Sequence, residues 1–215
     1  ILLCESYFLM KLPKILLFLF LFQIHDAHLD AYLDYKSPFH PTISENGMVV
    51  SQNLESSEIG TMILESGGNA VDAAVAVGFS LTTTLPRAGN IGGGGFMLVY
   101  IKETEELFSI DYRSRSSLNS NLKDLFGSKS PAQIQDNDYD LTKYDYKASA
   151  VPGTVYGLLE AHERFGDLPL EKVLQPVIDQ ARNGIIVSYD LHNAIGSSYQ
   201  LKKDPESRKI YFQNN

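Results

Sequence analysis

The chain has 215 residues, 44% of them apolar, which is enough to bury the core of one ordinary domain. Its formal net charge of −8 and its pI near 5.1 argue against nucleic-acid binding, because that class neutralises phosphates with clustered Lys and Arg. The composition also argues against collagen-like, disordered and multi-span membrane proteins. Because the charge disfavours nucleic acid, a small molecule or a peptide is the expected partner.

The first feature in chain order is a short basic segment, residues 10–14, followed by the apolar run of residues 15–22. This order is typical of a secretory signal peptide, and the run is shorter than the roughly 20 residues that a spanning helix needs. We interpret residues 10–31 as a signal peptide that directs the protein to the periplasm or out of the cell. An uncleaved signal that anchors the protein in the membrane is the alternative.

The signal peptide divides the chain into three parts. Residues 1–9 precede it and are set aside as upstream residues of uncertain origin, which leaves residues 32–215 as the exported part. The one cysteine, Cys4, lies before the signal. The exported part therefore has no thiol for catalysis, metal binding or a disulfide, and its stability must come from packing.

Two elements are expected at the start of the exported domain. Residues 47–51 have the length and apolar character of a short buried strand. Ser56 is then a candidate N-cap for a helix with apolar residues at helical spacing, and Gly67 and Gly68 provide its stop.

A second helix is predicted over residues 70–84. Asn69 and Asp72 have the spacing of a capping pair, and Pro86 follows the expected end. The helix is apolar almost all round and contains many alanines. It should therefore be buried and packed closely against a neighbouring element.

Four consecutive glycines, residues 92–95, are the most unusual feature of the sequence. Glycine permits backbone conformations and close approaches that other residues do not tolerate. The loop either serves as a tight backbone crossing or presents its N–H groups to an anion or oxyanion. It is neither a P-loop nor a dinucleotide fingerprint, because no Lys-Ser/Thr pair follows it and the next segment has the pattern of a strand.

Two strands are expected after the glycines, over residues 96–101 and 107–112, joined by a polar turn at residues 103–106. Residues 117–147 are polar and include the acidic stretch of residues 136–140. We interpret this part as a surface insertion.

The remaining pattern is helical. One helix is expected to open at residues 151–154 and to run to about Phe165, and another is expected over residues 170–183. The order helix, helix, strand, strand, helix, helix predicts an α+β fold in which helices pack on an antiparallel sheet.

Arg113 is the candidate ligand for an anionic group, because it directly follows the second strand. A guanidinium held at a strand end can bind a carboxylate through two parallel hydrogen bonds, although most such arginines are simply solvated. The five histidines show no metal-ligand spacing, and His162, between Glu160 and Glu163, is expected at a helix surface. Capping of its own helix accounts for Asp72.

Several segments, in this order along the chain, resemble the γ-glutamyltranspeptidase family. Together they cover roughly residues 47–190. The segments are SEIG at 57–60, ILESGGNAVDAAVA at 63–76, NIGGGGFM at 90–97, AVPGTVYG at 150–157, LQP at 174–176 and ARNG at 181–184. Each is moderately specific, and the resemblance depends on their common order.

The resemblance implies a layered αββα fold of the N-terminal-nucleophile hydrolase class, which would be incomplete in this chain. The family is made as one precursor that cuts itself into a large and a small subunit. A threonine exposed at the start of the small subunit attacks the γ-glutamyl carbonyl, with its own α-amine as the general base. We expect this chain to be the N-terminal portion of the large subunit, truncated before that threonine, so that it contains no catalytic residue.

The same resemblance implies the partners. The substrates would be small γ-glutamyl compounds such as glutathione, and the acceptor of the γ-glutamyl group would be water, an amino acid or a peptide. The small subunit from the same precursor is the implied protein partner, and no metal or organic cofactor is implied.

In the family, the arginine after an Asp-aromatic pair holds the substrate α-carboxylate, and the matching position here is Arg113, after Asp111 and Tyr112. The family arginine is usually followed by Glu and then Ala-Pro, whereas residues 114–117 are Ser-Arg-Ser-Ser. The loop after the strand is therefore altered, and Arg115 is an alternative carboxylate ligand.

Other functions on the same scaffold remain open. A cephalosporin-type acylase or a poly-γ-glutamate-processing enzyme would share these motifs and would differ in pocket residues elsewhere. A non-catalytic binding homologue would keep the glycine loop and lack the nucleophile.

Overall fold

The computed structural model describes residues 43–137 and 145–212, and the fold is given for these residues. Contacts divide the chain into two compact units, Ile1–Asn46 and Gly47–Asn215, and the described helices and strands lie in the second unit. The signal peptide expected at residues 10–31 lies outside the described residues.

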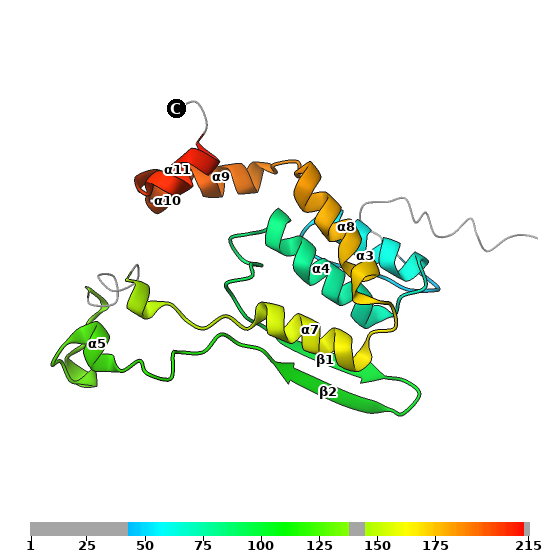
Figure 1. Ribbon diagram of the computed structural model, residues 1–215, viewed down its shortest axis with the longest axis horizontal. Helices are drawn as coiled ribbons and strands as arrows, with labels where there is room; N and C mark the ends of the chain where they lie inside the picture. The colour runs from blue at the N-terminus through cyan, green and yellow to red at the C-terminus, as the bar shows by residue number, and fades with distance from the viewer. Residues whose placement is uncertain (1–42, 138–144, 213–215) are drawn as a thin grey trace, which may run out of the picture. The chain divides into compact units, whose positions relative to one another are not determined.

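The second unit combines helices with a two-stranded antiparallel sheet (Figure 1). None of the helices within the described residues is both long and apolar enough to cross a membrane. In chain order the elements are α3 (Leu54–Glu65), α4 (Ala70–Thr84), β1 (Phe96–Ile101), β2 (Glu106–Asp111), α5 (Leu122–Phe126), η3 (Pro131–Gln133), η4 (Tyr146–Ala148), α7 (Thr154–Phe165), α8 (Leu170–Asn183), α9 (Tyr189–Ser197), α10 (Tyr199–Lys203) and α11 (Pro205–Tyr211).

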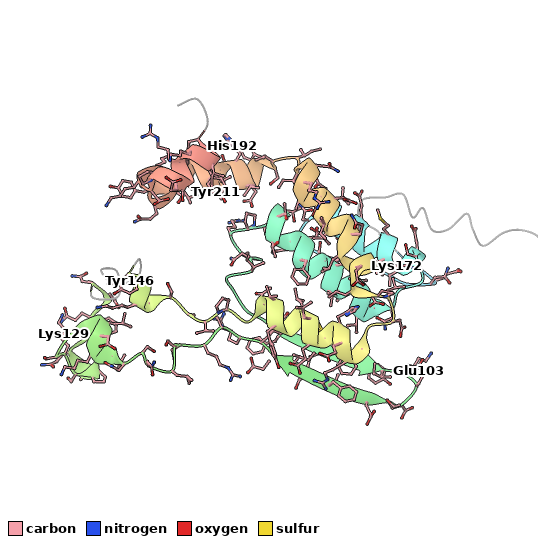
Figure 2. The ribbon with its side chains drawn as sticks, in the orientation of Figure 1. Glu103, Lys129, Tyr146, Lys172, His192 and Tyr211 are labelled. Atoms are coloured by element: carbon pink, nitrogen blue, oxygen red, sulfur yellow. The ribbon has the colours of Figure 1, made fainter. Side chains whose placement is uncertain are left out.

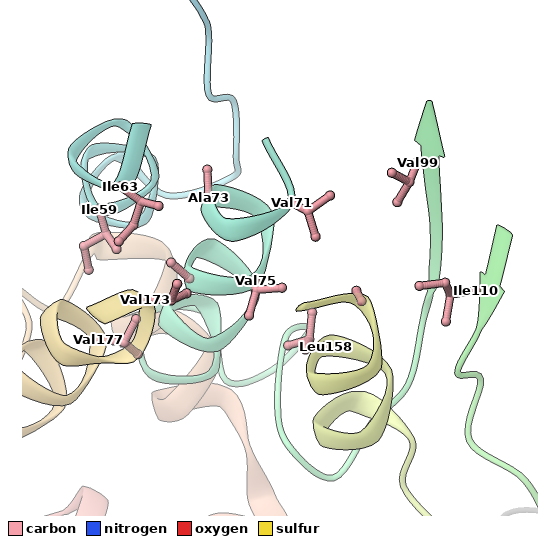
Figure 3. Packing of buried hydrophobic residues seen from close by; sticks show 12 residues of the cluster. Ile59, Ile63, Val71, Ala73, Val75, Val99, Ile110, Leu158, Val173 and Val177 are labelled. Atoms are coloured by element: carbon pink, nitrogen blue, oxygen red, sulfur yellow. The ribbon is translucent and has the colours of Figure 1, made fainter. Parts of the chain in front are cut away.

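The helix α4 lies at the centre of the core. It packs against α3, α7 and α8, and its residues Val75 and Ala76 are 0% exposed. Figure 3 shows Ile63 of α3, Val173 of α8 and Leu158 of α7 converging on it. The prediction of a buried, closely packed helix over residues 70–84 is confirmed.

The start of α3 differs from the sequence-based expectation, because Asn53 is the N-cap and Ser56 is not. The side chain of Asn53 accepts a hydrogen bond from the backbone N–H of Ser56 at 3.0 Å. The Ser56 hydroxyl instead lies 2.7 Å from Ser80 Oγ and 2.9 Å from Thr84 Oγ1 of α4, fully buried. Residue 56 belongs to the same helical stripe as Ile59 and is therefore turned towards α4.

Local signals correctly predicted the end of α3 and the start of α4. Gly67 has φ of +88° and its N–H donates to the carbonyl of Leu64, so glycine is required at this helix end. Asn69 and Asp72 form a capping box, as their spacing predicts.

Asp72 also joins α4 to the turn between α7 and α8. Its Oδ2 accepts hydrogen bonds from the N–H groups of Asn69 (3.0 Å), Asp167 (3.1 Å) and Leu168 (3.2 Å). Among the described residues its Oδ1 has no hydrogen-bond partner, and His162 Nε2 lies 3.6 Å away. Helix capping therefore explains only part of the role of this buried carboxylate.

The expectation that His162 lies at a helix surface is wrong. Its side chain is 14% exposed, and its Nε2 lies 2.8 Å from the carbonyl oxygen of Leu168. The histidine faces the start of α4, because α7 packs along that helix.

The two strands pair antiparallel, with Phe96 opposite Asp111 and Ile101 opposite Glu106, which confirms the expected hairpin. Val99 and Ile110 point from its inner face towards the helices (Figure 3). Glu103 lies in the turn that joins the strands (Figure 2). The outer face is exposed, and its apolar residues are Phe96, Leu98, Tyr100 and Leu107.

The strand expected at residues 47–51 is not present. This segment has no ladder partner among the described residues, where β1 and β2 form the sheet. Val49 is half-buried against the core, whereas Val50 is 81% exposed. Apolar content alone predicted a buried strand, but a strand also needs a neighbour that pairs its backbone groups.

The described residues of the insertion at 117–147 are mostly exposed and contain the short helix α5. The acidic stretch at 136–140 lies partly outside the described residues. The helices α9, α10 and α11 were not expected from the sequence. Their N-caps, Ser188, Ser198 and Asp204, were present as signals.

Candidate functional site

Arg113 directly follows β2, and its backbone is fixed there. Its N–H donates to Oδ1 of Asp111 at 3.0 Å. Its side chain is exposed and forms no ion pair with a carboxylate within residues 43–137 and 145–212. A guanidinium in this state is available to an anionic ligand.

The glycine loop, residues 92–95, crosses the backbone on either side of Arg113. Gly95 and Tyr112 exchange backbone hydrogen bonds of 3.3 and 3.1 Å, which extends the hairpin by one pair. A Cβ atom at Gly94 would lie 2.6 Å from the carbonyl oxygen of Tyr112 and 2.9 Å from the carbonyl carbon of Arg113. Glycine is therefore required at residue 94 by close backbone approach.

Of the two roles considered for the glycine loop, the structure supports the tight crossing. The N–H groups of Gly93 and Gly95 bond to the carbonyls of Asn90 and Tyr112, so these two donors are already used inside the protein. Anion binding by the loop stays a prediction for its other N–H groups.

The same loop holds the start of α7. The carbonyl of Gly93 accepts hydrogen bonds from the N–H groups of Gly153 (2.8 Å) and Thr154 (3.2 Å). The Thr154 hydroxyl donates to the carbonyl of Asn90 at 3.1 Å. The first N–H groups of a helix have no partner within it, so the glycine loop provides partners for α7.

Arg115, the alternative ligand, is also exposed and backbone-anchored. It exchanges two hydrogen bonds with Val151, of 3.1 and 2.7 Å. The altered segment at residues 114–117 is thus hydrogen-bonded to the residues that precede α7. Both arginines stay candidates on geometry alone.

Tyr112 is a residue of this site that the sequence did not single out. It is half-buried and packs against the core. This burial raises the pKa of its phenol, because the charged form loses hydration. The glycines at 94, 95, 153 and 157 surround it, and the available signal was their position in two of the family-like segments, NIGGGGFM and AVPGTVYG.

A cavity of about 800 Å³ lies elsewhere, between the start of α4, β1 and the end of α7. Ala70, Val99 and Phe165 contribute to its walls, whereas the glycine loop and residues 112–115 do not. Arg164 stacks over Phe165 there, with its guanidinium carbon 4.8 Å from the ring centroid. This cavity is not part of the Arg113 site.

Comparisons with known proteins identify the family. The family model described as Gamma-glutamyltranspeptidase matches residues 56–215. The glutathione hydrolase proenzyme of Escherichia coli K12 is 43% identical over 177 residues, which are 81% of this chain and 30% of that protein. The acylase ACY 1 proenzyme of Pseudomonas sp. V22 is 34% identical over 178 residues, 80% of this chain and 31% of that protein.

A solved structure gives the same result. The γ-glutamyltranspeptidase of Helicobacter pylori superposes with a TM-score of 0.71 and 31% identity, over 81% of this chain and 49% of that chain. The present chain thus spans about half of that solved chain and less than a third of the two curated relatives. The expected α+β fold, an incomplete αββα fold of the N-terminal-nucleophile hydrolases, is confirmed.

The family match includes the glycine loop, Arg113 and the start of α7. The chain belongs to the γ-glutamyltranspeptidase family, whose enzymes hydrolyse or transfer γ-glutamyl groups.

Proposed function

We propose that the chain supplies the N-terminal part of the large subunit of an enzyme that hydrolyses glutathione-like γ-glutamyl compounds and transfers their γ-glutamyl group. The position of Arg113 carries this proposal. Its backbone is fixed by Asp111 and by the glycine loop, while its guanidinium is exposed. Such a guanidinium suits a ligand with a carboxylate.

The substrate has two ends, and Arg113 of this chain binds one of them. A γ-glutamyl group has an α-amine and an α-carboxylate at one end and the scissile amide at the other. Arg113 binds the α-carboxylate through two parallel hydrogen bonds, which sets the distance from this anchor to the amide carbonyl. Fixing that distance accelerates attack by reducing the orientational freedom that the reaction must overcome.

The nucleophile belongs to the small subunit, outside this chain. Its N-terminal threonine attacks the amide carbonyl, and the threonine α-amine takes the hydroxyl proton and passes it to the leaving amine. An ester is left on the threonine. Water then releases glutamate, or the amine of an acceptor amino acid or peptide takes the γ-glutamyl group.

The outer face of the hairpin supports the partnership with a small subunit. Phe96, Leu98 and Tyr100 are 69%, 71% and 60% exposed on that face. In a layered αββα fold a second sheet covers such a face and removes its apolar side chains from water. The second sheet would come in part from the small subunit of the same precursor.

A second candidate function is acylase activity on β-lactam side chains, because the acylase of Pseudomonas sp. V22 is also a relative at 34% identity. A glutaryl group keeps the carboxylate of a γ-glutamyl group and lacks its α-amine, so Arg113 would suit both substrates.

Substrate preference of the full-length precursor that contains this chain tests the proposal. We expect self-cleavage and turnover of γ-glutamyl p-nitroanilide, with much slower turnover of glutaryl p-nitroanilide. A preference for the glutaryl substrate would support the acylase instead. Binding of glutathione without any turnover, in a chain that has no small-subunit threonine, would support the binding homologue.

Export is a separate proposal, and the basic segment at residues 10–14 with the apolar run at 15–22 supports it. Expressed in bacteria from Met10, the protein should reach the periplasm with a new N-terminus between about residues 28 and 32. N-terminal sequencing of the periplasmic fraction measures this. Recovery of only uncleaved cytoplasmic protein would contradict it, and uncleaved protein in the membrane fraction would support the anchor.

A further inference from the structure

Tyr112 occupies a space that glycines leave open on both sides. A Cβ atom at Gly95 would lie 2.8 Å from Cε2 and 3.0 Å from the hydroxyl oxygen of Tyr112. A Cβ atom at Gly157 would overlap the Cβ and Cγ atoms of the same side chain. Any residue larger than glycine at 157 would therefore displace the tyrosine.

The backbone of Tyr112 is enclosed in the same way. Its carbonyl group would be overlapped by a Cβ atom at Gly153 and approached to 2.6 Å by one at Gly94. Tyr112 is thus held at both its ring and its carbonyl by four glycines, which we call the glycine slot: Gly94, Gly95, Gly153 and Gly157.

The two sides of the glycine slot come from different segments and are bonded to each other. Gly94 and Gly95 belong to the loop after α4, and Gly153 and Gly157 belong to the start of α7. The carbonyl of Gly93 bonds to two N–H groups at the start of α7, so the slot has fixed walls. A binding side chain is placed more precisely when packing locks the residues that support it.

We infer that Tyr112 is a positioning residue for Arg113, which means that the glycine slot sets where the guanidinium meets the substrate carboxylate. This inference rests on the function proposed for Arg113. The next peptide unit is held as well, because the N–H of Arg113 bonds to Asp111. A displacement of the anchor by about 1 Å can reduce the rate up to about a hundredfold.

Gly157→Ala tests the slot, with Gly196→Ala as its control. Both glycines lie inside helices, and alanine raises helix propensity at both. A Cβ atom at Gly196 meets nothing within 4 Å. The two variants therefore differ in the clash with Tyr112.

The readout is the preference for γ-glutamyl p-nitroanilide over 4-aminobutyryl p-nitroanilide, the same substrate without its α-carboxylate. In the full-length, self-cleaved enzyme we expect Gly157→Ala to reduce this preference in kcat/KM about ten- to a hundredfold, mainly through KM. Gly196→Ala should keep the preference of the wild type. A merely structural role would reduce turnover of both substrates alike and leave the preference intact.

Tyr112→Ala and Tyr112→Phe give a second test that creates no clash. Tyr112→Ala empties the slot and should also reduce the preference, whereas Tyr112→Phe refills it and should recover most of the loss. If Gly157→Ala does not self-cleave, the two tyrosine variants test the positioning role by themselves. Failure of both Gly157→Ala and Tyr112→Ala to mature would overturn the inference, because Tyr112 would then act in folding.

The kinetic results distinguish a failure of the role inferred for Tyr112 from a failure of the function proposed for Arg113. A wild type that does not distinguish the two anilides contradicts the role of Arg113 itself. A wild type that distinguishes them, and loses the distinction in Arg113→Ala but keeps it in Gly157→Ala and Tyr112→Ala, overturns the positioning role of Tyr112 alone.

Discussion

The helical core and the β1–β2 hairpin bury their apolar side chains to different extents. α4 is enclosed by α3, α7 and α8, and its Val75 is 0% exposed. The hairpin is covered on one face, where Val99 is 6% exposed, and open on the other, where Leu98 is 71% exposed. Neighbouring residues of one strand thus lie in opposite environments.

This difference separates the region that is enclosed within the described residues from the region that we propose a second subunit covers. The N-caps of α3 and α4 are made within the chain, and their buried apolar residues belong to the core. The hairpin carries Arg113 at its end and presents an apolar face without cover among the described residues. The proposed substrate anchor therefore lies on the less enclosed of the two regions.

The largest expected effect comes from removing the rest of the precursor. Residues 32–215 expressed alone should fold poorly and should not hydrolyse a γ-glutamyl anilide, because the open hairpin face is unfavourable in water and the proposed nucleophile lies in the small subunit. Release of p-nitroaniline by the purified fragment measures this. Any turnover above that of buffer would contradict the placement of the nucleophile in the small subunit.

A charge on the open face should prevent assembly in the full-length precursor. Leu98→Asp would place an unpaired carboxylate under the second sheet, and burial of such a charge is strongly unfavourable. We expect loss of self-cleavage, seen as a single uncleaved band on a gel. Leu118→Asp is the control, since Leu118 is 103% exposed in the insertion and should tolerate the change. Normal self-cleavage of Leu98→Asp would mean that this face stays in water.

In the helical core, Asp72→Ala should destabilise the protein by about 3–5 kcal/mol, because three N–H groups lose a buried charged acceptor. Asp124→Ala is its control. Asp124 also stands three residues after an Asn N-cap, at α5, but it is exposed, and its loss should cost less than about 1 kcal/mol. Thermal unfolding of the full-length protein measures both. Equal losses of stability in Asp72→Ala and Asp124→Ala would show that burial of Asp72 is unimportant.

The smallest expected effect is a pH dependence at Tyr112. Burial raises its pKa above the ordinary value, so the folded state favours the protonated phenol. Its contribution to stability is complete below about pH 10 and is lost as the pH rises through the folded-state pKa. Between pH 9 and 11, the Tm of the wild type should therefore fall more than that of Tyr112→Phe. If the Tm of the two proteins falls equally with pH, the phenol of Tyr112 is exposed to water in the folded protein.

The sequence predicted those elements whose signals are local. The capping box at Asn69 and the glycine stop at Gly67 set the ends of α3 and α4, and the register of the hairpin agrees with its alternating pattern. These features depend on residues a few positions apart, so a single sequence contains them.

The errors concern contacts between distant segments. Ser56 was expected to cap α3, but it bonds to Ser80 and Thr84 on α4. His162 was expected in water, but it faces Asp72. The packing of Tyr112 among four glycines was missed because the glycine slot joins residues about 60 positions apart. Packing between such segments is not encoded in a local pattern.

The proposed function depends most on Arg113, which we propose anchors the α-carboxylate of a γ-glutamyl substrate. It is tested by kcat/KM of the self-cleaved full-length enzyme for γ-glutamyl and 4-aminobutyryl p-nitroanilide, in the wild type and in Arg113→Ala, Arg113→Lys and Arg115→Ala. Loss of a bidentate, charge-assisted contact should cost about 2–4 kcal/mol, or roughly thirty- to a thousandfold, for the γ-glutamyl substrate only. Lysine keeps the charge without the planar fork and should recover part of the loss.

All these variants should still mature, because self-cleavage involves no free substrate carboxylate. We expect Arg113→Ala to abolish the preference of the wild type for the γ-glutamyl substrate and Arg115→Ala to keep it. A wild type without this preference, or loss of the preference in Arg115→Ala and not in Arg113→Ala, would contradict the assignment.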